Sequence, residues 1–409
     1  MNILFVSISS IPNLSGHSIS IDLIRELKNN GHNVFVVGSV QRREGKETFM
    51  SSEEDCKVLR VKTGNVTKCN KIEKGIATLL LPYQYISAIK KYFKGVKFDL
   101  VLYPTPPVTQ VSTVEFIKKR DKAITYLLLK DIFPQNAVDI GMMKKSGIKG
   151  ILYKMFRKKE HRLYKISDYI GCMSQANVDY VIDHNPKVDK KKVHICPNTT
   201  DINYDFLSDE RKLEIREKYN IPTDKTVFIY GGNLGKPQDI PFVIQCLKAN
   251  ADKDDRFFII CGKGTEFPKL KAYVEAEKPQ NVLLINGLPK AEYEEFVKAF
   301  DVGLIFLDKR FTIPNFPSRS LSYMNSKMPI LACTDKNTDI GKVISENGFG
   351  WWCESDDADK FTKAVDFAIG EDLKAMGEKG YKYLCENYTS KNAYEIIMKN
   401  VEKKEKITV

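Results

Sequence analysis

Short apolar runs alternate with amphipathic segments along both halves of the chain. In the first half, the apolar runs lie at residues 2–7, 33–38, 99–103, 123–129, 169–174 and 193–196. In the second half, they lie at residues 226–230, 257–261, 282–285, 302–307 and 329–333. Their length is typical of buried parallel strands, whereas the segments between them repeat apolar residues at helical spacing. This alternation predicts two α/β domains, each a doubly wound sheet with helices on both faces.

A polar stretch, residues 199–224, interrupts the pattern near the middle of the chain and contains a charged helix at about 209–218. Because 409 residues exceed what one compact core accommodates, we place a domain boundary there. The predicted domains are 1–205 and 206–386, each Rossmann-like. The remaining residues, 387–409, are expected to form a helix that crosses back to the first domain.

Charge and cysteine content narrow the class of protein. The formal net charge of +12 calls for an anionic partner, such as nucleic acid, a membrane surface or a charged substrate. No apolar run approaches the roughly 20 residues of a membrane-spanning helix, and the N-terminus lacks the pattern of a signal peptide. The nine cysteines form no CxxC pair and lie mostly in apolar runs, which is typical of reduced, buried thiols. We therefore expect a cytoplasmic protein.

The most basic segment, residues 143–165, carries nine Lys or Arg residues and a single acid, Glu160. Apolar residues recur in it at helical spacing, which predicts a basic amphipathic helix. Such a helix suits the anionic surface of a membrane, but the same apolar stripe could pack on the domain core and leave the lysines in water. Nucleic acid is less favoured, because no binding motif or base-stacking array accompanies the charge.

A strand, an irregular loop, a helix at about 318–327 and a second strand follow one another between Val302 and Thr334. Ligands of open parallel sheets bind outside the carboxyl ends of the strands, where this loop must lie. Arg319 stands in the first turn of the helix, beside free backbone N–H groups, with Asn315 or Ser318 as the cap. This combination suits a phosphate group, although a plain surface arginine is an equally valid interpretation.

Two further residues occupy positions where ligands bind in α/β domains. Gly16 precedes a helix at about 18–30 and would let the backbone approach a ligand, or would simply form a turn. Asp131 follows the strand at 123–129 and would act over the crevice, or would cap the next turn.

Signals for a metal ion are weak. Asp252 and Asp254 have the spacing of a metal-binding DxD motif, but they lie in a charged turn before a strand, at the end opposite the crevice. The five histidines form no set with ligand spacing. We predict no metal and no cofactor.

Several motifs resemble one family. In the second half they are YGGNLGKPQD, CGKG, NGLPKAEYEEFVKAFDVGLIFL and IPNFPSRSLSYMNSKMPILA. They resemble the second domain of family-4 retaining glycosyltransferases with the GT-B fold, in which two Rossmann-like domains face each other across a cleft. In the first half, VHICPNTTD resembles the family's PNGVD segment, and LLLKDIFPQ is similar to the RDLWP segment of a bacterial subgroup that builds capsule, O-antigen and exopolysaccharide. The resemblance is weaker from residue 41 to 95, where acceptor specificity usually resides.

The resemblance implies a sugar nucleotide, expected to be a UDP-sugar, held mostly by the second domain. Lys236 and Arg319 would bind the diphosphate in place of a metal ion, because departure of the nucleotide leaves two negative charges that fixed cations must stabilise. Asp131 would lie near the acceptor or the reacting face of the sugar and completes the catalytic set. The residues expected to bind the donor are Gly16, His17, Gly232, Asn233, Gly262, Lys263, Gly287, Leu288, Pro289, Asn315, Phe316, Ser318 and Ser322.

Within this set, Gly287 to Pro289 match the segment that holds the base, and Asn315 with Phe316 match the loop that contacts the sugar. Two positions depart from the family pattern. The family commonly has two glutamates around this loop, the second gripping the nucleotide ribose, and here Pro314 and Ser322 stand in their places.

The implied function is a metal-independent transferase of hexosyl or N-acetylhexosaminyl type, acting on a lipid-linked sugar acceptor at the inner face of the cell membrane. Residues 143–165 would contact the anionic membrane surface. The loss of both glutamates motivates an alternative, a catalytically silent, membrane-associated partner of polysaccharide enzymes. A sugar-nucleotide epimerase of the same architecture is a third interpretation.

Overall fold

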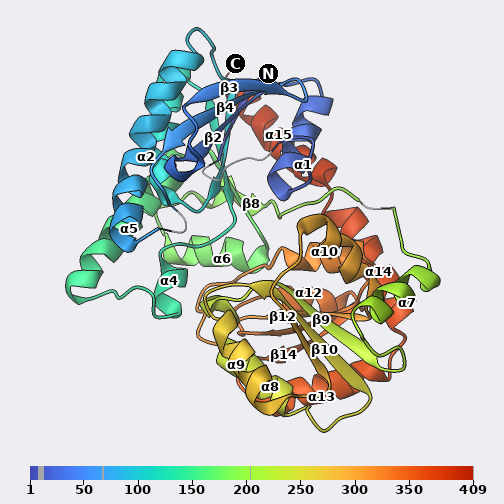
Figure 1. The fold of residues 1–409 in the computed structure, drawn as a ribbon. Coiled ribbons are helices and arrows are strands. Elements are labelled where there is room, and N and C mark those ends of the chain that lie inside the picture. The colour runs from blue at the N-terminus through green and yellow to red at the C-terminus, as the bar shows by residue number, and fades with distance from the viewer. Residues whose placement is uncertain (8–12, 67–68, 203, 409) are drawn as a thin grey trace. The chain divides into compact units, whose positions relative to one another are not determined.

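The computed structural model describes residues 1–7, 13–66, 69–202 and 204–408 (Figure 1). Two compact units make up the chain. Unit 1 contains residues 1–201 and 390–409, and unit 2 contains residues 202–389. The chain passes from one unit to the other after Asp201, four residues before the boundary that the sequence predicts, and returns at Ser390.

Unit 1 is built on an eight-stranded sheet in the order β3-β4-β2-β1-β5-β6-β7-β8. All neighbouring strands are parallel except the antiparallel pair of β3 and β4. The strands are β1 (Asn2–Val6), β2 (Asn33–Gln41), β3 (Phe49–Glu53), β4 (Cys56–Thr63), β5 (Leu100–Thr105), β6 (Ile124–Leu129), β7 (Tyr169–Cys172) and β8 (Val193–Ile195). The helices are α1 (Ile19–Asn29), α2 (Lys71–Tyr92), α3 (Val111–Asp121), α4 (Gln135–Asp139), α5 (Gly147–Ile166), α6 (Gln175–His184) and α15 (Ser390–Thr408), with 3-10 turns at Arg42–Glu44, Val108–Gln110 and Lys190–Lys192.

The sequence patterns missed β3 and β4, which lie at the edge of the sheet. β3 has only Phe49 and Met50 as apolar residues, and in β4 Lys57, Arg60 and Lys62 interrupt the apolar ones, so neither strand forms a continuous apolar run. The helix α15 lies beside α1 (Figure 1), where Ala393, Ile397 and Val401 pack with the buried face of α1 in one core cluster. This packing accounts for the membership of the C-terminal helix in unit 1.

Unit 2 is built on a six-stranded, wholly parallel sheet in the order β11-β10-β9-β12-β13-β14. The strands are β9 (Thr226–Asn233), β10 (Arg256–Lys263), β11 (Val282–Ile285), β12 (Val302–Phe306), β13 (Ile330–Thr334) and β14 (Gly350–Glu354). The helices are α7 (Asp209–Lys218), α8 (Ile240–Lys248), α9 (Phe267–Glu277), α10 (Lys290–Phe296), α11 (Arg319–Asn325), α12 (Ile340–Glu346), α13 (Ala358–Ile369) and α14 (Leu373–Asn387), with 3-10 turns at Lys236–Gln238 and Val297–Ala299. Separate hydrophobic clusters fill the two faces of this sheet, which is the predicted doubly wound arrangement.

Strand order reverses once along each sheet. In unit 1 the chain moves outward from β1 through β2 to β4, then starts again on the other side at β5. In unit 2 it moves outward from β9 to β11, then starts again at β12. A crevice for ligands forms at the carboxyl ends of the strands where the direction changes. The candidate sites are therefore the carboxyl ends of β1 and β5 in unit 1 (the β1–β5 edge) and the carboxyl ends of β9 and β12 in unit 2 (the β9–β12 edge).

Among the described helices, none has both the length and the apolar composition that crossing a membrane requires.

Candidate functional site

At the β9–β12 edge of unit 2, Tyr323 fixes the helix α11 against the sheet. Its side chain is fully buried, and its hydroxyl accepts a hydrogen bond from the backbone N–H of Gly231 at 3.1 Å. The hydroxyl proton faces the carbonyls of Leu304 and Ile229 at 3.1 and 3.2 Å, so one side chain joins β9 and β12. Gly303 leaves room for the ring, because a Cβ at that position would lie 2.4 Å from it. These contacts set the place of α11 over the end of β9.

Arg319, the first residue of α11, lies over the carboxyl end of β9. Its guanidinium stacks on the ring of Tyr230 at 4.1 Å and would lie 3.4 Å from a Cβ at Gly232. Its Nη1 atom is buried and has no hydrogen-bond partner among the described residues, and no described carboxylate forms an ion pair with it. A buried guanidinium without an anion is costly, so this geometry is suited to an anionic ligand.

The start of α11 differs from the sequence prediction. The helix has seven residues, and Ser318 occupies the cap position without a side-chain capping bond. Neither Ser318 nor Asn315 therefore acts as the expected cap. The side chain of Arg319, rather than the end of a long helix, supplies the positive charge at this edge.

The glycine-rich segment after residue 230 also differs from the prediction. Residues 231–233 continue β9 beyond the apolar run at 226–230, and they pair with β10 up to Asn233 opposite Lys263. A Cβ at Gly262 would lie 1.9 Å from the carbonyl oxygen of Gly232, so the glycine at 262 is required for this close pairing. Lys236 is exposed and begins the 3-10 turn that follows.

The predicted base-binding segment lies at the neighbouring strand end. Gly287 has a φ of +66°, a value that favours glycine. A Cβ at this position would lie 2.9 Å from the aliphatic stem of Lys263. Leu288 packs on the core, and exposed Pro289 precedes α10. The structure thus brings Lys263 and Gly287 together.

Two tyrosines beside Arg319 and Tyr323 were not predicted from the sequence. Tyr230 lies beneath the guanidinium, and Tyr293 of α10 lies over Gly231, where a Cβ would meet its hydroxyl oxygen at 1.7 Å. Burial raises the pKa of both phenols above the ordinary value, so both are neutral at physiological pH. Each tyrosine lies in or next to a sequence motif, but aromatic residues in such positions are usually core, and no spacing marks them.

The predicted sugar-binding loop is held by a buried carboxylate. The backbone N–H of Asn315 donates to the hydroxyl of Thr338 at 3.0 Å, and that hydroxyl donates to Asp335 at 2.9 Å. Phe316 packs against Tyr388, with 5.9 Å between ring centroids. Ser322 is half-buried on α11, and its carbonyl accepts from the hydroxyl of Ser326. Asp335 was missed because nothing in its sequence context separates it from a turn residue.

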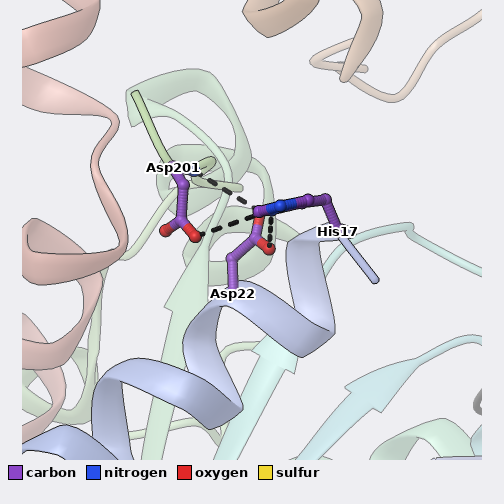
Figure 2. Close-up of side chains that lie close together, drawn as sticks. All are labelled: His17, Asp22 and Asp201. Carbon is purple, nitrogen blue, oxygen red and sulfur yellow. Dashed lines mark hydrogen bonds and ion pairs between the residues drawn. The ribbon is translucent and has the colours of Figure 1, made fainter. Parts of the chain in front are cut away.

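At the β1–β5 edge of unit 1, the predicted residue His17 points at two carboxylates (Figure 2). Its Nδ1 lies 3.4 Å from buried Asp22 and 3.8 Å from Asp201, and the three groups lie within 4.8 Å of one another. Burial, followed by the charge of Asp201, raises the pKa of Asp22. Arg25 already donates to Asp201 at 2.7 Å and to Asp22 at 3.4 Å, so we interpret the cluster as an ion-pair network rather than a metal site.

The same network holds Gly16 and the start of α15. Arg25 donates from Nη2 to the carbonyl of Gly16 at 2.7 Å, and Ser390 donates to Asp201 at 2.9 Å. One guanidinium therefore holds the carbonyls of Leu14 and Gly16 next to α1. A role for Gly16 and His17 at a donor ligand stays a prediction.

Asp131 lies two residues beyond the end of β6, on the side of the unit 1 sheet where the strands have their carboxyl ends. Its Oδ2 accepts from the amide of Asn136 at 2.7 Å, whereas its Oδ1 is buried without a hydrogen-bond partner among the described residues. Burial raises the pKa of this carboxyl to about 6, against the opposing effect of the Asn136 hydrogen bond. Burial also lowers the pKa of neighbouring Lys130 to about 8. Shifts of this kind are common at functional sites.

The basic helix predicted at 143–165 is α5, and it is partly detached from the core. Its C-terminal half packs through buried Leu163 and Tyr164, and Arg157 pairs with buried Glu160. In its N-terminal half, Ile151 and Leu152 are exposed by 69% and 47%. Exposed lysines at 144, 145, 154 and 158 accompany these two apolar side chains, and the side chains of Ile148 and Lys149 lie outside the described residues.

Residues 211–383 match the model of the family described as Glycosyl transferases group 1. The chain carries a group 1 glycosyltransferase domain. The matched residues run from α7 to α14, so the glycosyltransferase domain includes Arg319, the three tyrosines around it and the ends of β9 and β10.

A relative and two solved structures extend the likeness to both units. The probable glycosyltransferase WbjE from Pseudomonas aeruginosa is 24% identical over 320 residues, which are 78% of this chain and 77% of that protein. Sucrose-phosphate synthase from Thermosynechococcus elongatus has a TM-score of 0.76 at 13% identity, with 100% of both chains covered. HepE from Anabaena, solved in complex with UDP and glucose, has a TM-score of 0.70 at 12% identity, with 98% of this chain and all of that chain covered. The two units together have the GT-B fold.

Substituting Tyr323 by Phe removes the hydroxyl that joins β9 and β12. We expect a loss of about 1–3 kcal/mol in the free energy of unfolding of unit 2, because a buried N–H and a buried carbonyl lose their partner. Urea unfolding measures the loss, and hydrogen exchange at the Gly231 amide should become faster. Tyr219→Phe is the matched control, since that hydroxyl bonds half-exposed Glu292, and its loss should cost under about 1 kcal/mol. Equal effects of the two changes would contradict the assigned role of Tyr323.

The buried carboxyl of Asp131 predicts a pH dependence of stability. Between about pH 4 and pH 6 the folded protein keeps a proton that the unfolded chain has released, so stability falls as the pH rises through this window. In Asp131→Asn this contribution is absent. We expect the free energy of unfolding of the variant, relative to that of wild type, to rise by on the order of 2 kcal/mol from pH 4.5 to pH 7. Asp252→Asn, in an exposed turn, is the control and should show no such shift.

Proposed function

We propose that this chain is a retaining glycosyltransferase that moves a sugar from a nucleotide donor, of the UDP-sugar class, to a lipid-linked acceptor. The observation that carries the proposal is the guanidinium of Arg319, buried over the carboxyl end of β9 with no anionic partner among the described residues. It lies where the strand order of unit 2 reverses, within the glycosyltransferase domain.

Charge development in the reaction explains why the site would need this group. Breaking the bond between the sugar and the diphosphate leaves two negative charges on the departing nucleotide. A cation already held in place stabilises that charge without the cost of reorganising water. Arg319 would serve the diphosphate in this way, and exposed Lys236 at the next turn would add a second positive charge, so the reaction would need no metal ion.

The donor would lie across neighbouring strand ends. Gly232 and Asn233 would border the diphosphate, with Gly262 allowing the close pairing behind them. Lys263 and Gly287, which touch each other, would hold the nucleoside with Leu288 and Pro289. Asn315 and Phe316, on the loop that Asp335 anchors, would contact the sugar. Ser318 and Ser322 would border the same pocket from α11.

Relatives support the class of reaction and of pathway. HepE was solved with UDP and glucose bound, which supports a UDP-linked donor here. A solved structure of WaaG, a glycosyltransferase involved in lipopolysaccharide biosynthesis, has a TM-score of 0.63 at 13% identity and covers 97% of this chain and 99% of its own. The likeness to WaaG supports a role in bacterial surface polysaccharide synthesis, and the likeness to the probable glycosyltransferase WbjE supports sugar transfer.

Unit 1 would supply the acceptor side. Asp131, with one carboxylate oxygen buried and unpartnered, would lie near the acceptor hydroxyl or the reacting face of the sugar. The departing phosphate would itself take the acceptor proton on that face. The exposed Ile151 and Leu152 of α5, surrounded by lysines, would insert into the inner face of the cell membrane and bring the enzyme to a lipid-linked acceptor.

One observation favours a second function, a catalytically silent partner of polysaccharide enzymes. Pro314 has no side-chain group that could bond a ribose, and Ser322 is shorter than the glutamate common in the family. Calorimetric titration with UDP and GDP separates the two functions, because a silent partner need not bind either nucleotide tightly. An epimerase would convert a sugar nucleotide with no acceptor present.

Removal of the Arg319 charge tests the central step. We expect Arg319→Gln to lower turnover of sugar transfer by about 100-fold or more, by analogy with the loss of one donor to a developing negative charge. The measurement is release of UDP from a UDP-sugar panel in the presence of a membrane lipid extract. Arg211→Ala is the control, because Arg211 forms only surface ion pairs in the same unit. Near-normal turnover of the Gln variant would refute the role of Arg319.

Membrane contact through α5 has its own test. We expect the double change Lys154→Glu and Lys158→Glu to lower binding to vesicles of phosphatidylserine and phosphatidylcholine by about 10-fold or more, since each basic residue near an anionic surface contributes about 1 kcal/mol. Sedimentation with vesicles measures the binding. Lys363→Glu with Lys374→Glu, an equal charge change on exposed positions of unit 2, should leave it close to wild type. An equal loss in both double variants would indicate a general charge effect and contradict the assignment to α5.

A further inference from the structure

Unit 1 contains a cavity of about 940 Å³ between the N-terminal half of α2 and the carboxyl end of β4. This volume is in the range of sites for small molecules. Because β4, β2, β1, β5 and β6 are parallel neighbours, the cavity opens at the same edge of the sheet as Asp131. The residues of the floor and mouth that matter here are Thr63, Gln84, Ile72, Ile76 and Leu80.

Two of the residues that line the cavity carry a buried hydrogen-bonding atom that the described protein leaves without a partner. Thr63, only 2% exposed, ends β4 with its Oγ1 buried, and Gln84 of α2 has a buried Oε1. Neither atom has a hydrogen-bond partner among the described residues. Buried polar atoms are nearly always paired, because leaving one unpaired is costly. The hydroxyl can donate and accept, while the amide oxygen only accepts, so a ligand with hydroxyl groups would satisfy both.

The mouth of the cavity is apolar and exposed. Ile72, Ile76 and Leu80 line it at four-residue spacing, with exposed fractions of 77%, 56% and 49%. Leu79 and Tyr83, also exposed, lie within the same arc of the helix, whereas the opposite face of α2 is buried in the core. A continuous apolar stripe of this kind on a soluble surface marks a binding site for an apolar ligand or surface.

The cations at the rim are already neutralised. Arg42 pairs with Glu73 at 2.9 Å, and Lys62 pairs with Glu47 at 2.5 Å. An anion would have to displace these carboxylates. The cavity therefore favours an uncharged head group, in contrast to the unpaired guanidinium of Arg319 in unit 2.

From these three properties we infer that the cavity binds the sugar head of a glycolipid, with its hydrocarbon chain along the exposed stripe of α2. The sugar hydroxyls bond Thr63 Oγ1 and Gln84 Oε1, and the chain covers Ile72, Ile76 and Leu80. The inference rests on the proposed transfer to a lipid-linked acceptor and names the part of unit 1 that recognises it.

The test uses the full-length protein and n-octyl-β-D-glucoside, below the concentration at which it forms micelles. Isothermal titration calorimetry compares this probe with glucose, which lacks the chain, and with 1-octanol, which lacks the head. We expect the glucoside to bind at least about 10-fold more tightly than either half. Thr63→Val, which keeps the shape of the side chain, should weaken glucoside binding by about 3- to 10-fold and leave octanol binding unchanged.

Ile76→Ser should weaken both the glucoside and octanol by about 10-fold, whereas Phe367→Ser, an exposed aromatic residue of α13 in unit 2, is the matched control and should change neither. Absence of glucoside binding, or equal effects of Ile76→Ser and Phe367→Ser, would overturn the inference. Titration with UDP on the same samples separates the two proposals. Glucoside binding without UDP binding would contradict the donor site but keep this cavity, and UDP binding without glucoside binding would do the reverse.

Discussion

The arrangement of the β9–β12 edge in unit 2 depends on one buried group, the guanidinium of Arg319, which lies over the end of β9 with an aromatic ring beneath it. Stacking on Tyr230 offsets part of the cost of removing Arg319 from water, but the Nη1 atom keeps hydrogen-bonding capacity that no described residue uses. The surrounding geometry depends on this placement. Tyr323 fixes the helix that carries Arg319, and Gly231 and Gly303 provide the space that Tyr293 and Tyr323 occupy. A larger residue at either glycine would displace a tyrosine and with it the cation.

In both units the candidate site residues lie at the carboxyl ends of the parallel strands. In unit 2 the β9–β12 edge gathers Arg319, the β9–β10 strand ends and the segment at Gly287. In unit 1 the His17 network lies at the β1–β5 edge. Asp131 and the cavity beside α2 lie at the carboxyl ends of other strands, on the same side of the sheet. The two sites differ in charge, because one leaves a cation unpaired while the other pairs its cations at the rim. This difference matches a charged donor and a neutral head group.

The sequence predicted the parts of the molecule that depend on local patterns. Continuous apolar runs marked the parallel strands of both sheets except β4 and β14, and a residue just past a strand, as at Asp131, could be placed at the carboxyl ends of the strands by topology alone. The sequence did not predict β3, β4 or β14. β3 has serines beside its two apolar residues, β4 interrupts its apolar residues with charged ones, and β14 buries only Gly350 and Cys353. The predicted strand also ended at residue 230, because glycines usually interrupt strands, whereas Gly262 here allows the pairing of β9 with β10 to continue to Asn233.

The tyrosines around Arg319 and the unpaired atoms of Thr63 and Gln84 were beyond sequence reasoning for another reason. A buried tyrosine and a threonine at a strand end occur throughout ordinary cores, so only their contacts in the folded structure distinguish them. The same holds for Asp335, whose role in holding the loop at Asn315 follows from a hydrogen-bond chain through Thr338.

The hydrogen bond between Ser390 and Asp201 has a further meaning for how such a protein is assembled. These residues are the last before the chain leaves unit 1 and the first after it returns, and their side chains meet at 2.9 Å. Unit 2 is thus an insertion whose two ends leave unit 1 at one point, as in domains that tolerate being exchanged. Recombination at this junction could replace the whole of unit 2 while the two ends of unit 1 stay next to each other.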